Sequence, residues 1–292
     1  MDANRTGKAC LYMVATPLGN LDDITGRAVE ILRRVPVIAC EDTRHSRRLF
    51  QRYGIDARLI SYHEHNEQQA AARIVTLVET GTEVALVCDA GTPGISDPGY
   101  RVVRLALERG IQVVPVPGPS AVTTALCISG LPTDSFYFSG FLPARDSGVR
   151  RKLAELAKLR ATLVFYCPAR RIEKVLGLAA EILGNRQAAL CRELTKVHEE
   201  MLRGRLQSIE KELKERPAVK GEIVLLVAGY EGNEDKPGEE KAGAVEEFLD
   251  RLDQAETVGA RRLTTLVSEK LGLPRNRVYP LVCGWLNRKS AG

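Results

Sequence analysis

The chain has 292 residues, which is enough for more than one domain, and its 44% hydrophobic and 27% charged residues are typical of a globular protein. No apolar run approaches the length of a membrane span and the N-terminal residues contain no apolar signal segment, so we expect a cytoplasmic protein without a membrane partner. The net charge is only +5, but seven basic residues against Glu269 alone give residues 257–292 a charge of +6. This basic segment indicates either a polyanionic partner or simply a solvated helix face.

The N-terminal part alternates between short apolar runs and segments with helical spacing of apolar residues. The runs, which we interpret as strands, are residues 10–15, 37–40, 59–62, 84–87 and 113–116. Strands that alternate with helices are typical of an α/β fold, so we predict a mostly parallel sheet.

The fourth of these runs leads into EVALVCDAGTPGISDPG (83–99), a buried strand followed by Asp89 and a loop rich in glycine and proline. Open α/β sheets bind their ligands at the carboxyl ends of the strands, where this loop would lie. The loop matches neither the phosphate-binding G-x-x-x-x-G-K-[ST] motif nor the dinucleotide-binding G-x-G-x-x-G motif. A tight surface turn whose acid caps the next helix would also explain it, so a binding loop and a structural turn both stay open.

Polar clusters follow three of the predicted strands. They are Glu41, Asp42 and Arg44; His63, His65 and Asn66; and Asp89. In a parallel sheet these clusters fall on one edge, which favours a site over three separate helix caps. Acids beside small, glycine-rich loops suit hydroxyl or ammonium groups, and this indicates a cofactor that carries a nucleoside or an amino acid.

A metal site and disulfides are not indicated. The seven cysteines form no C-x-x-C pair, and four of them lie in or at the end of apolar runs. His63 and His65 are two residues apart, but no third ligand is evident, so we expect no metal.

The second half of the chain predicts a different sheet. Beyond a Gly-Leu-Pro turn at 130–132, strands at 136–141, 162–166, 188–191, around 201 and at 223–227 include steps without an intervening helix, so we expect a mixed sheet. The predicted organisation is an α/β domain at 8–131, a second at 132–230, a flexible linker at 231–243 and a basic, helix-turn-helix-like module at 244–292. Pro280 predicts a kink or an early end in the last helix.

Nine segments match a known family in order. They are LYMVATPLGNLDDIT (11–25), ACEDTRHSRRL (39–49), HEHNE (63–67), VALVCDAGTPGISDPGYRVV (84–103), VVPVPGPSAVTTAL (113–126), GFLP (140–143), LVFYCPARRI (163–172), RELTKVHEE (192–200) and KGEIVLLVAG (220–229). With them the chain resembles the tetrapyrrole methylase-like methyltransferases, and within these the enzymes that 2′-O-methylate a cytidine in the decoding region of 16S rRNA. The resemblance implies two α/β domains, S-adenosyl-L-methionine held between them, and a homodimer.

The resemblance also implies which residues contact the methyl donor. They are Asp89, Ala90, Gly91, Thr92 and Ile95 in the first loop, Ser120 and Ala121 in the PGPSA turn, Tyr166 and Leu194 in the second domain, and Ala228 after the last strand. The chain departs from the family's pattern at Cys167-Pro168-Ala169, where more polar residues are usual, and this puts the second-domain contacts in doubt.

Methylation of a ribose would also need groups for the acceptor. A ribose hydroxyl is a weak acid, so a positioned base would help. The candidates are Asp22, Glu41, Asp42 and His65 as bases, with Asn20 or Lys196 as orienting or charge-stabilising groups. Each of them could instead cap a helix or form an ion pair. Candidates for holding RNA are Arg44, Arg47 and Arg48 on one short helix, Asn66, and Arg150 with Arg151, although a solvated basic surface explains the arginines equally well.

We therefore expect an enzyme that methylates 16S rRNA or the small ribosomal subunit. One alternative is an enzyme of the same fold that methylates a corrin-type tetrapyrrole or a modified protein side chain. Another is a non-catalytic RNA-binding or ribosome-assembly factor. The EDTR and HEHNE segments and the basic C-terminal segment favour RNA over a small substrate, and the intact DAGTPGISDP loop favours donor binding over a factor without catalysis.

Overall fold

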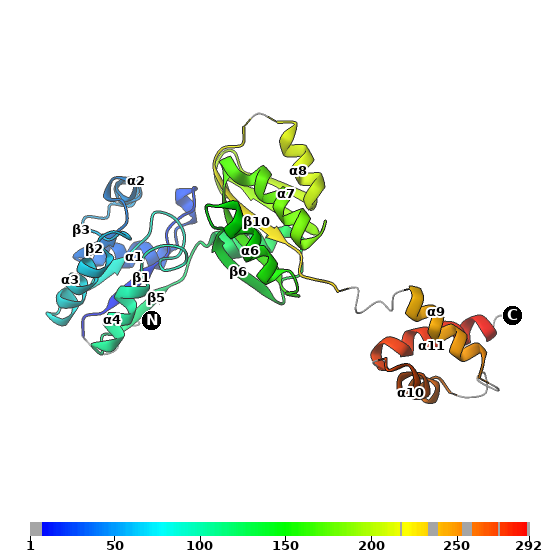
Figure 1. The fold of residues 1–292 in the computed structure, drawn as a ribbon. Helices are drawn as coiled ribbons and strands as arrows, with labels where there is room; N and C mark the ends of the chain where they lie inside the picture. Colours follow the sequence, from blue (N-terminus) through cyan, green and yellow to red (C-terminus); the bar gives the residue numbers. More distant parts are fainter. Residues whose placement is uncertain (1–7, 217, 233–238, 253–258, 274, 291–292) are drawn as a thin grey trace. The chain divides into compact units, whose positions relative to one another are not determined.

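The computed structural model describes residues 8–216, 218–232, 239–252, 259–273 and 275–290 (Figure 1). The chain divides into two compact units, Met1–Gly229 and Tyr230–Gly292, each of which is described by itself below. Within the described ranges, no helix combines the length and the apolar character that a membrane span requires. All seven cysteines are free, and five of them are buried.

The first sheet of the larger unit is entirely parallel, which confirms the predicted α/β class. Its strands are β1 (Leu11–Val14), β2 (Val37–Cys40), β3 (Arg58–Ser61), β4 (Val84–Leu86) and β5 (Val113–Val116), in the order β3-β2-β4-β1-β5. Most of these strands are apolar throughout because both faces of the sheet are covered. Alternate residues belong to different cores: Ile38 packs with α1 and α2, whereas Val37 and Ala39 pack with α3 and α4. These helices are α1 (Gly26–Arg34), α2 (Thr43–Tyr53), α3 (Glu67–Glu79) and α4 (Tyr100–Glu108).

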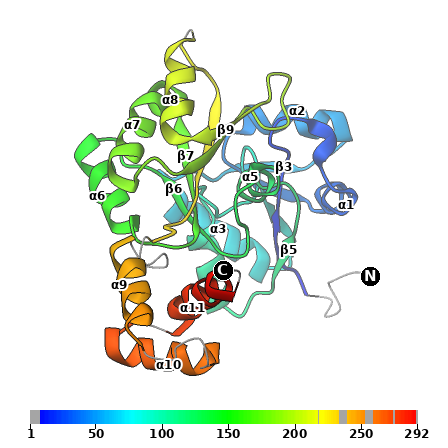
Figure 2. The same cartoon turned by 90° about the vertical axis from the view of Figure 1, so that its right-hand side faces the viewer.

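The second sheet is mixed, as the sequence predicted. Its strands are β6 (Phe136–Phe141), β7 (Thr162–Pro168), β8 (Gln187–Arg192), β9 (Glu200–Arg205) and β10 (Glu222–Val227), in the order β6-β7-β10-β8-β9. Only the β6–β7 pair is parallel. Figure 2 shows α6 (Asp146–Leu156), α7 (Ile172–Leu183) and α8 (Leu206–Lys214) on one side of the strands and α5 (Ala121–Ser129) on the other. Apolar residues of α5 pack against this second sheet, so α5 connects the two sheets.

The smaller unit consists of α9 (Glu239–Asp250), α10 (Ala260–Leu271) and α11 (Arg275–Ser290) around a core of its own. Two expectations need correction here. Residues 239–243, predicted as the end of the linker, are helical, while residues 233–238 of that linker lie outside the described residues. Helix α11 also continues past Pro280, so the early end expected there is wrong, whereas the expected kink stays a prediction. The helix continues because Val278, Val282 and Trp285 on both sides of Pro280 are buried, and this packing outweighs one missing backbone hydrogen bond.

Candidate active site

A cavity of about 410 Å³ lies in the larger unit and is lined by both sheets. One side, here called the acidic wall, consists of Leu18, Glu41, Asp89–Thr92, Ile95–Asp97, Ser120 and Ala121. The other side, the aromatic wall, consists of Phe141, Tyr166–Pro168, Cys191, Leu194 and Gly221–Val224. The cavity therefore brings together nine of the ten residues that the family resemblance implied for the methyl donor.

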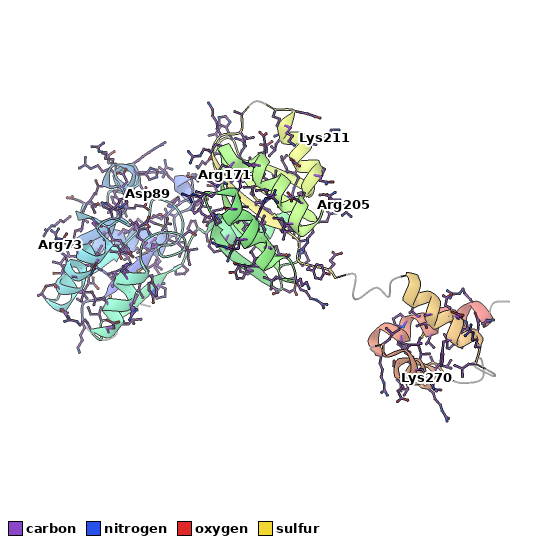
Figure 3. The ribbon with its side chains drawn as sticks, in the orientation of Figure 1. Arg73, Asp89, Arg171, Arg205, Lys211 and Lys270 are labelled. Carbon is purple, nitrogen blue, oxygen red and sulfur yellow. The ribbon has the colours of Figure 1, made fainter. Side chains whose placement is uncertain are left out.

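The acidic wall is built on the loop that follows β4, where Asp89 lies (labelled in Figure 3). Gly91 and Gly94 have φ angles of +85° and +84°, which a residue with a side chain rarely adopts. Ser96 is also left-handed, with φ of +63°, although it is not a glycine. The loop is held in place because Thr16 and Gly91 exchange two backbone hydrogen bonds, at 2.8 and 2.9 Å. Strained backbone that is fixed in this way is typical of binding sites.

Several carboxyl groups surround this side of the cavity. The backbone N–H of Asp42 donates to Oδ1 of Asp89 at 3.1 Å, so the loops after β2 and β4 are in contact. Burial raises the pKa of Glu41, and the neighbouring charges of Asp97, Asp89 and Asp42 raise it further. Burial also raises the pKa of Asp97, and the negative charges of Asp89 and Glu222 raise it further. Such a wall favours a ligand that carries positive charge or hydroxyl groups.

The aromatic wall presents ring edges and a neutral phenol. Tyr166 packs edge to face against Phe138 and Phe141, with ring centroids 4.9 and 5.3 Å apart. Burial raises the pKa of Tyr166 to about 12, so its hydroxyl keeps its proton at neutral pH and can donate a hydrogen bond. Together the walls suit a ligand with a planar ring at one end and charged groups at the other.

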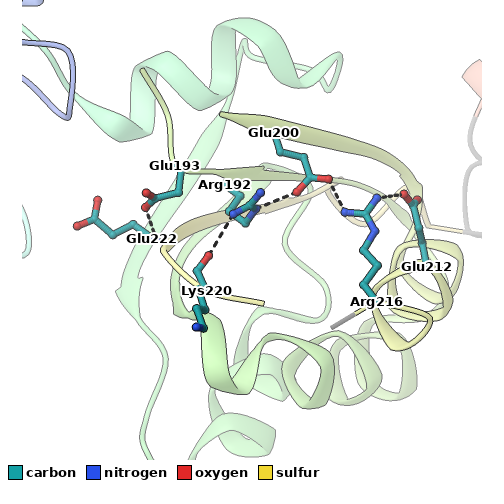
Figure 4. A network of polar contacts seen from close by, with 7 residues as sticks. All are labelled: Arg192, Glu193, Glu200, Glu212, Arg216, Lys220 and Glu222. Atoms are coloured by element: carbon teal, nitrogen blue, oxygen red, sulfur yellow. Dashed lines mark hydrogen bonds and ion pairs between the residues drawn. The ribbon is translucent and has the colours of Figure 1, made fainter. Parts of the chain in front are cut away.

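Ion pairs fix the backbone behind the aromatic wall (Figure 4). The N–H of Glu222 donates to Oε1 of Glu193 at 2.9 Å. In addition, Nζ of Lys196, which that figure does not draw, lies 3.0 Å from Glu193 and 3.1 Å from Glu222. Gly221, with φ of +100°, is required beside them, because an added Cβ would lie 2.6 Å from the carboxyl group of Glu193. A further chain runs from Arg192 through Glu200 to Arg216 and Glu212.

Three of the predicted catalytic residues have local structural roles instead. The side chain of Asn20 caps a short 3₁₀ helix, Leu21–Asp23, by accepting from the N–H of Asp22 at 3.2 Å. Asp22 forms an ion pair with Arg52. Asp42 caps α2 by accepting from backbone N–H groups, above all that of Arg44 at 2.7 Å, and this bond lowers the pKa of Asp42. None of the three lines the cavity, so the capping and ion-pair roles that the sequence left open are the ones observed.

Of the other three candidates, only Glu41 lines the cavity. Lys196 is engaged by its two glutamates and packs over Gly19, where an added Cβ would lie 2.2 Å from its Cγ. His65 is exposed and does not border the cavity. Asn66, predicted to hold substrate, closes its own turn, because its side chain bonds to the N–H of His63 at 2.9 Å and to the carbonyl of Ser61 at 3.1 Å.

The predicted RNA-binding arginines lie on two helices. Arg44, Arg47 and Arg48 are exposed on α2 and form no ion pair among the described residues. On α6, Arg150 pairs with Glu181, whereas Arg151 is exposed. The α2 cluster begins at Arg44, three residues after the cavity residue Glu41.

Ala228 is the one predicted donor residue that the structure places elsewhere. Strand β10 is antiparallel to β7, so Glu222 lies beside Pro168 at the cavity, whereas Val227 lies beside Leu163 at the far end. Ala228 follows Val227 and is therefore remote from the cavity. The same register explains why Gly221 and Glu222, which line the cavity, were missed. Asp97 was also missed, although it belongs to the same loop as Asp89 and its acidic character was visible in the sequence.

Comparisons with known proteins agree with this geometry. The profile of the Tetrapyrrole (Corrin/Porphyrin) Methylases family matches residues 10–210. Two proteins named Ribosomal RNA small subunit methyltransferase I are similar along nearly their whole length. The one from Micromonospora olivasterospora is 45% identical, over 96% of this chain and 88% of its own length. The one from Escherichia coli O157:H7 is 44% identical, over 92% of this chain and 93% of its own length.

Solved structures share the fold at low sequence identity. The uroporphyrin-III-C-methyltransferase from Thermus thermophilus superposes with a TM-score of 0.54 at 21% identity, covering 75% of this chain and 94% of its own. A diphthine synthase superposes with a TM-score of 0.59 at 15% identity, covering 76% and 90%. These likenesses confirm the predicted fold.

The cavity also fits the methyl donor of this family, S-adenosylmethionine. Its volume of about 410 Å³ lies within the range of about 300–1,000 Å³ found for ligand sites. The carboxyl groups of the acidic wall suit the ammonium, ribose hydroxyl and sulfonium groups of the donor, and the aromatic wall suits its adenine ring. The chain therefore belongs to the tetrapyrrole methylase family and, within it, to the ribosomal RNA small subunit methyltransferase I family, and it is an S-adenosylmethionine-dependent methyltransferase.

Proposed function

We propose that this enzyme methylates the 2′-hydroxyl of a cytidine ribose in the decoding region of 16S rRNA. The observation that carries the proposal is the similarity to proteins named Ribosomal RNA small subunit methyltransferase I, at 41–48% identity over most of both chains. Arg44, Arg47 and Arg48 on α2, which form no ion pair in the part of the chain that the structure describes, support it, because a polyanionic substrate needs cations near the reacting group.

The donor would lie between the two walls. Asp89 is placed to accept hydrogen bonds from donor hydroxyl or ammonium groups, and the backbone of Ala90–Thr92 can approach closely because Gly91 has no side chain. Ile95, Ser120, Ala121 and Leu194 would enclose the donor, and Tyr166 would contact its planar ring. When bound, the donor supplies a methyl group on a positively charged sulfur. The protein holds the acceptor oxygen in line with that methyl group, which can supply much of the acceleration.

Glu41 is the general base that the geometry favours. It lines the cavity, and its raised pKa brings it nearer to neutrality than an exposed glutamate, as efficient proton transfer requires. Asp22 and Asp42 are already engaged in an ion pair and in a helix cap. In this proposal Glu41 accepts the proton of the ribose hydroxyl, while Arg44, Arg47 and Arg48 bind phosphates of the RNA.

The enzyme would act as a cytoplasmic homodimer. Strand β6 lies at the edge of its sheet, and Phe136 and Tyr137 on it are exposed. Exposed aromatic side chains on an edge strand are typical of a covered surface. Light scattering on the purified protein should give twice the mass of the chain, and a monomer that is active would contradict this part of the proposal.

The proposed activity can be tested by methyl transfer from labelled S-adenosylmethionine to small ribosomal subunits that lack the modification, with free 16S rRNA in parallel. Nuclease digestion should map the label to one cytidine ribose in the decoding region. Glu41→Gln should reduce the rate by a factor of about 100 to 10,000 with unchanged donor affinity. Label on a base or on a protein would contradict the ribose assignment, and no label despite donor binding would favour a small-molecule or protein substrate.

A further inference from the structure

A second pocket, of about 440 Å³, lies in the smaller unit between α10 and α11. It is lined by Arg261, Thr264, Thr265, Arg275, Tyr279 and Pro280, and we call it the α10–α11 groove. Figure 2 shows the two helices with α9 beside them. Both arginines are exposed, and 46% of Tyr279 is accessible.

The cations of this unit fall into two groups. Arg251 pairs with Glu247, Arg288 with Glu246 and Lys289 with Asp250, so the acids of α9 neutralise its own end and the end of α11. In the part of the unit that the structure describes, the two arginines of the α10–α11 groove form no ion pair. The charges of these two arginines are therefore not neutralised by the acids of α9.

The sequence shows the same separation of charge. Residues 230–256 contain ten acidic and three basic residues, whereas residues 257–292 contain seven basic residues and one acidic residue. Lys270 on α10, labelled in Figure 3, adds a cation to the second segment. This segregation leaves a segment of net positive charge, which attracts anionic partners.

The groove offers chemistry for two parts of a nucleotide at once. Guanidinium groups bind phosphate oxygens in a bidentate manner. An accessible tyrosine ring beside a proline presents a flat surface on which a base can stack. Thr264 and Thr265 use their hydroxyl protons within α10, donating to the carbonyls of Ala260 and Arg261 at 2.7 and 3.1 Å, so they add little specificity.

We propose that the α10–α11 groove binds an unpaired segment of RNA, with phosphates on Arg261 and Arg275 and one base against Tyr279. The segment must be unpaired because base faces are not accessible within an RNA duplex. The proposal rests on the proposed function only for the identity of the RNA, which would be 16S rRNA. Because the smaller unit is covalently joined to the catalytic unit, the groove would raise the local concentration of substrate at the cavity.

The test is the binding of a fluorescein-labelled oligocytidylate to the full chain, followed by anisotropy over a range of salt concentrations. The double variant Arg261→Ala/Arg275→Ala should bind at least about tenfold more weakly, and its salt slope should fall by about 1.4, the value for two contacts with single-stranded phosphates. Tyr279→Ala should also bind about tenfold more weakly but with an unchanged salt slope, because stacking releases no counterions.

Two variants serve as controls. Tyr279→Phe should restore binding, since it keeps the ring and removes only the hydroxyl. Arg251→Ala removes one cation from the same unit, but that cation is paired on α9 and outside the groove, so affinity should stay within about twofold. Thermal melting of each variant would establish that the unit remains folded.

Other outcomes would overturn the proposal. If a hairpin duplex binds with the same affinity as the oligocytidylate, the ligand is not an unpaired RNA segment. If polyglutamate competes with the RNA, and this competition depends on the two arginines but not on Tyr279, the ligand is an acidic protein surface instead. If the groove variants bind RNA like the wild type while small subunits are still methylated, the groove assignment is wrong and the proposed function stands. If the variants lose RNA binding but the wild-type enzyme transfers no methyl group to the subunits, the groove assignment stands and the proposed function fails.

Discussion

The two walls of the cavity are constructed in different ways. The acidic wall comes from loops at the carboxyl ends of parallel strands, where α/β sheets generally bind ligands. The aromatic wall comes from a mixed sheet, in which the end of β7 and the start of β10 meet because the two strands are antiparallel. The difference indicates a division of roles: the first wall selects charge and hydroxyl groups, and the second provides shape and a planar contact.

Both walls are held rigidly, but by different forces. The loop after β4 is fixed by backbone hydrogen bonds between Thr16 and Gly91. The loop between β8 and β9 is fixed by the ion pairs of Lys196 with Glu193 and Glu222, and its residue Glu193 has a left-handed φ of +50°. The second wall should therefore respond more strongly to salt than the first.

The largest effect should come from exchanging one acid on each wall for its amide. Asp89→Asn should weaken the binding of S-adenosylmethionine by about 100-fold, the size expected when a charged hydrogen-bond acceptor is lost. Glu222→Gln should change affinity by no more than about threefold, because the Glu222 side chain is 75% exposed and paired with Lys196. Calorimetric titration would measure both, and equal losses would contradict the division of roles.

Glycines in the segments that build the two walls allow a second comparison, in which the free energy of unfolding is measured. Gly94→Ala introduces only the strain of a left-handed residue in open space and should cost about 1 kcal/mol. Gly221→Ala adds a clash with the Glu193 carboxyl group and should cost about 2 kcal/mol. Thermal melts would show a larger decrease in Tm for Gly221→Ala, and the reverse order would mean that the loop after β4 is the stiffer one.

Aromatic substitution should have a smaller effect, on donor affinity alone. Tyr166→Leu removes the half-buried ring between Phe138 and Phe141 and should weaken donor binding about tenfold. Tyr137→Leu, on the exposed part of the same sheet, removes a ring that contacts Lys152 and does not line the cavity. Its donor affinity should match the wild type, and a loss equal to that of Tyr166→Leu would place the adenine ring elsewhere.

The smallest effects should appear as opposite pH dependences. Burial raises the pKa of Asp97 in the folded state, so its contribution to stability is present below its unfolded pKa and is lost as pH rises through the folded pKa. Asp97→Asn should therefore raise Tm at neutral pH and leave it unchanged below about pH 4.

Glu193, which lies behind the aromatic wall, should behave in the opposite way. Although burial alone raises its pKa, the N–H of Glu222 and the ammonium of Lys196 lower it overall. Its stabilising contribution is thus present above the unfolded pKa and is lost as pH falls through the folded pKa. Glu193→Gln should lower Tm at neutral pH and have little effect in acid. If both variants shift Tm in the same direction at neutral pH, the electrostatic contrast between the walls is wrong.

The acidic wall could be predicted from the sequence because parallel strands bring their carboxyl ends together whatever their order. The loop from Asp89 to Ile95 was therefore placed correctly at the sheet edge. The aromatic wall depends on strand order and direction, which apolar runs do not reveal, and this is why Glu222 was missed. Ala228 was implied by the family resemblance and not by the strand pattern. Among the catalytic candidates, Glu41 and Asp42 are adjacent in the sequence, and only the structure separates a cavity residue from a helix cap.

The most direct test of the two-walled cavity is a crystal structure of the enzyme with S-adenosylhomocysteine, the product that remains after methyl transfer. We expect the ligand in the cavity, with its ribose or amino group on Asp89 and its adenine ring against the side that contains Tyr166. Both walls should contact the same molecule. A ligand bound outside the cavity, or one that contacts only the loop after β4, would contradict the central claim that the two sheets form the donor site together.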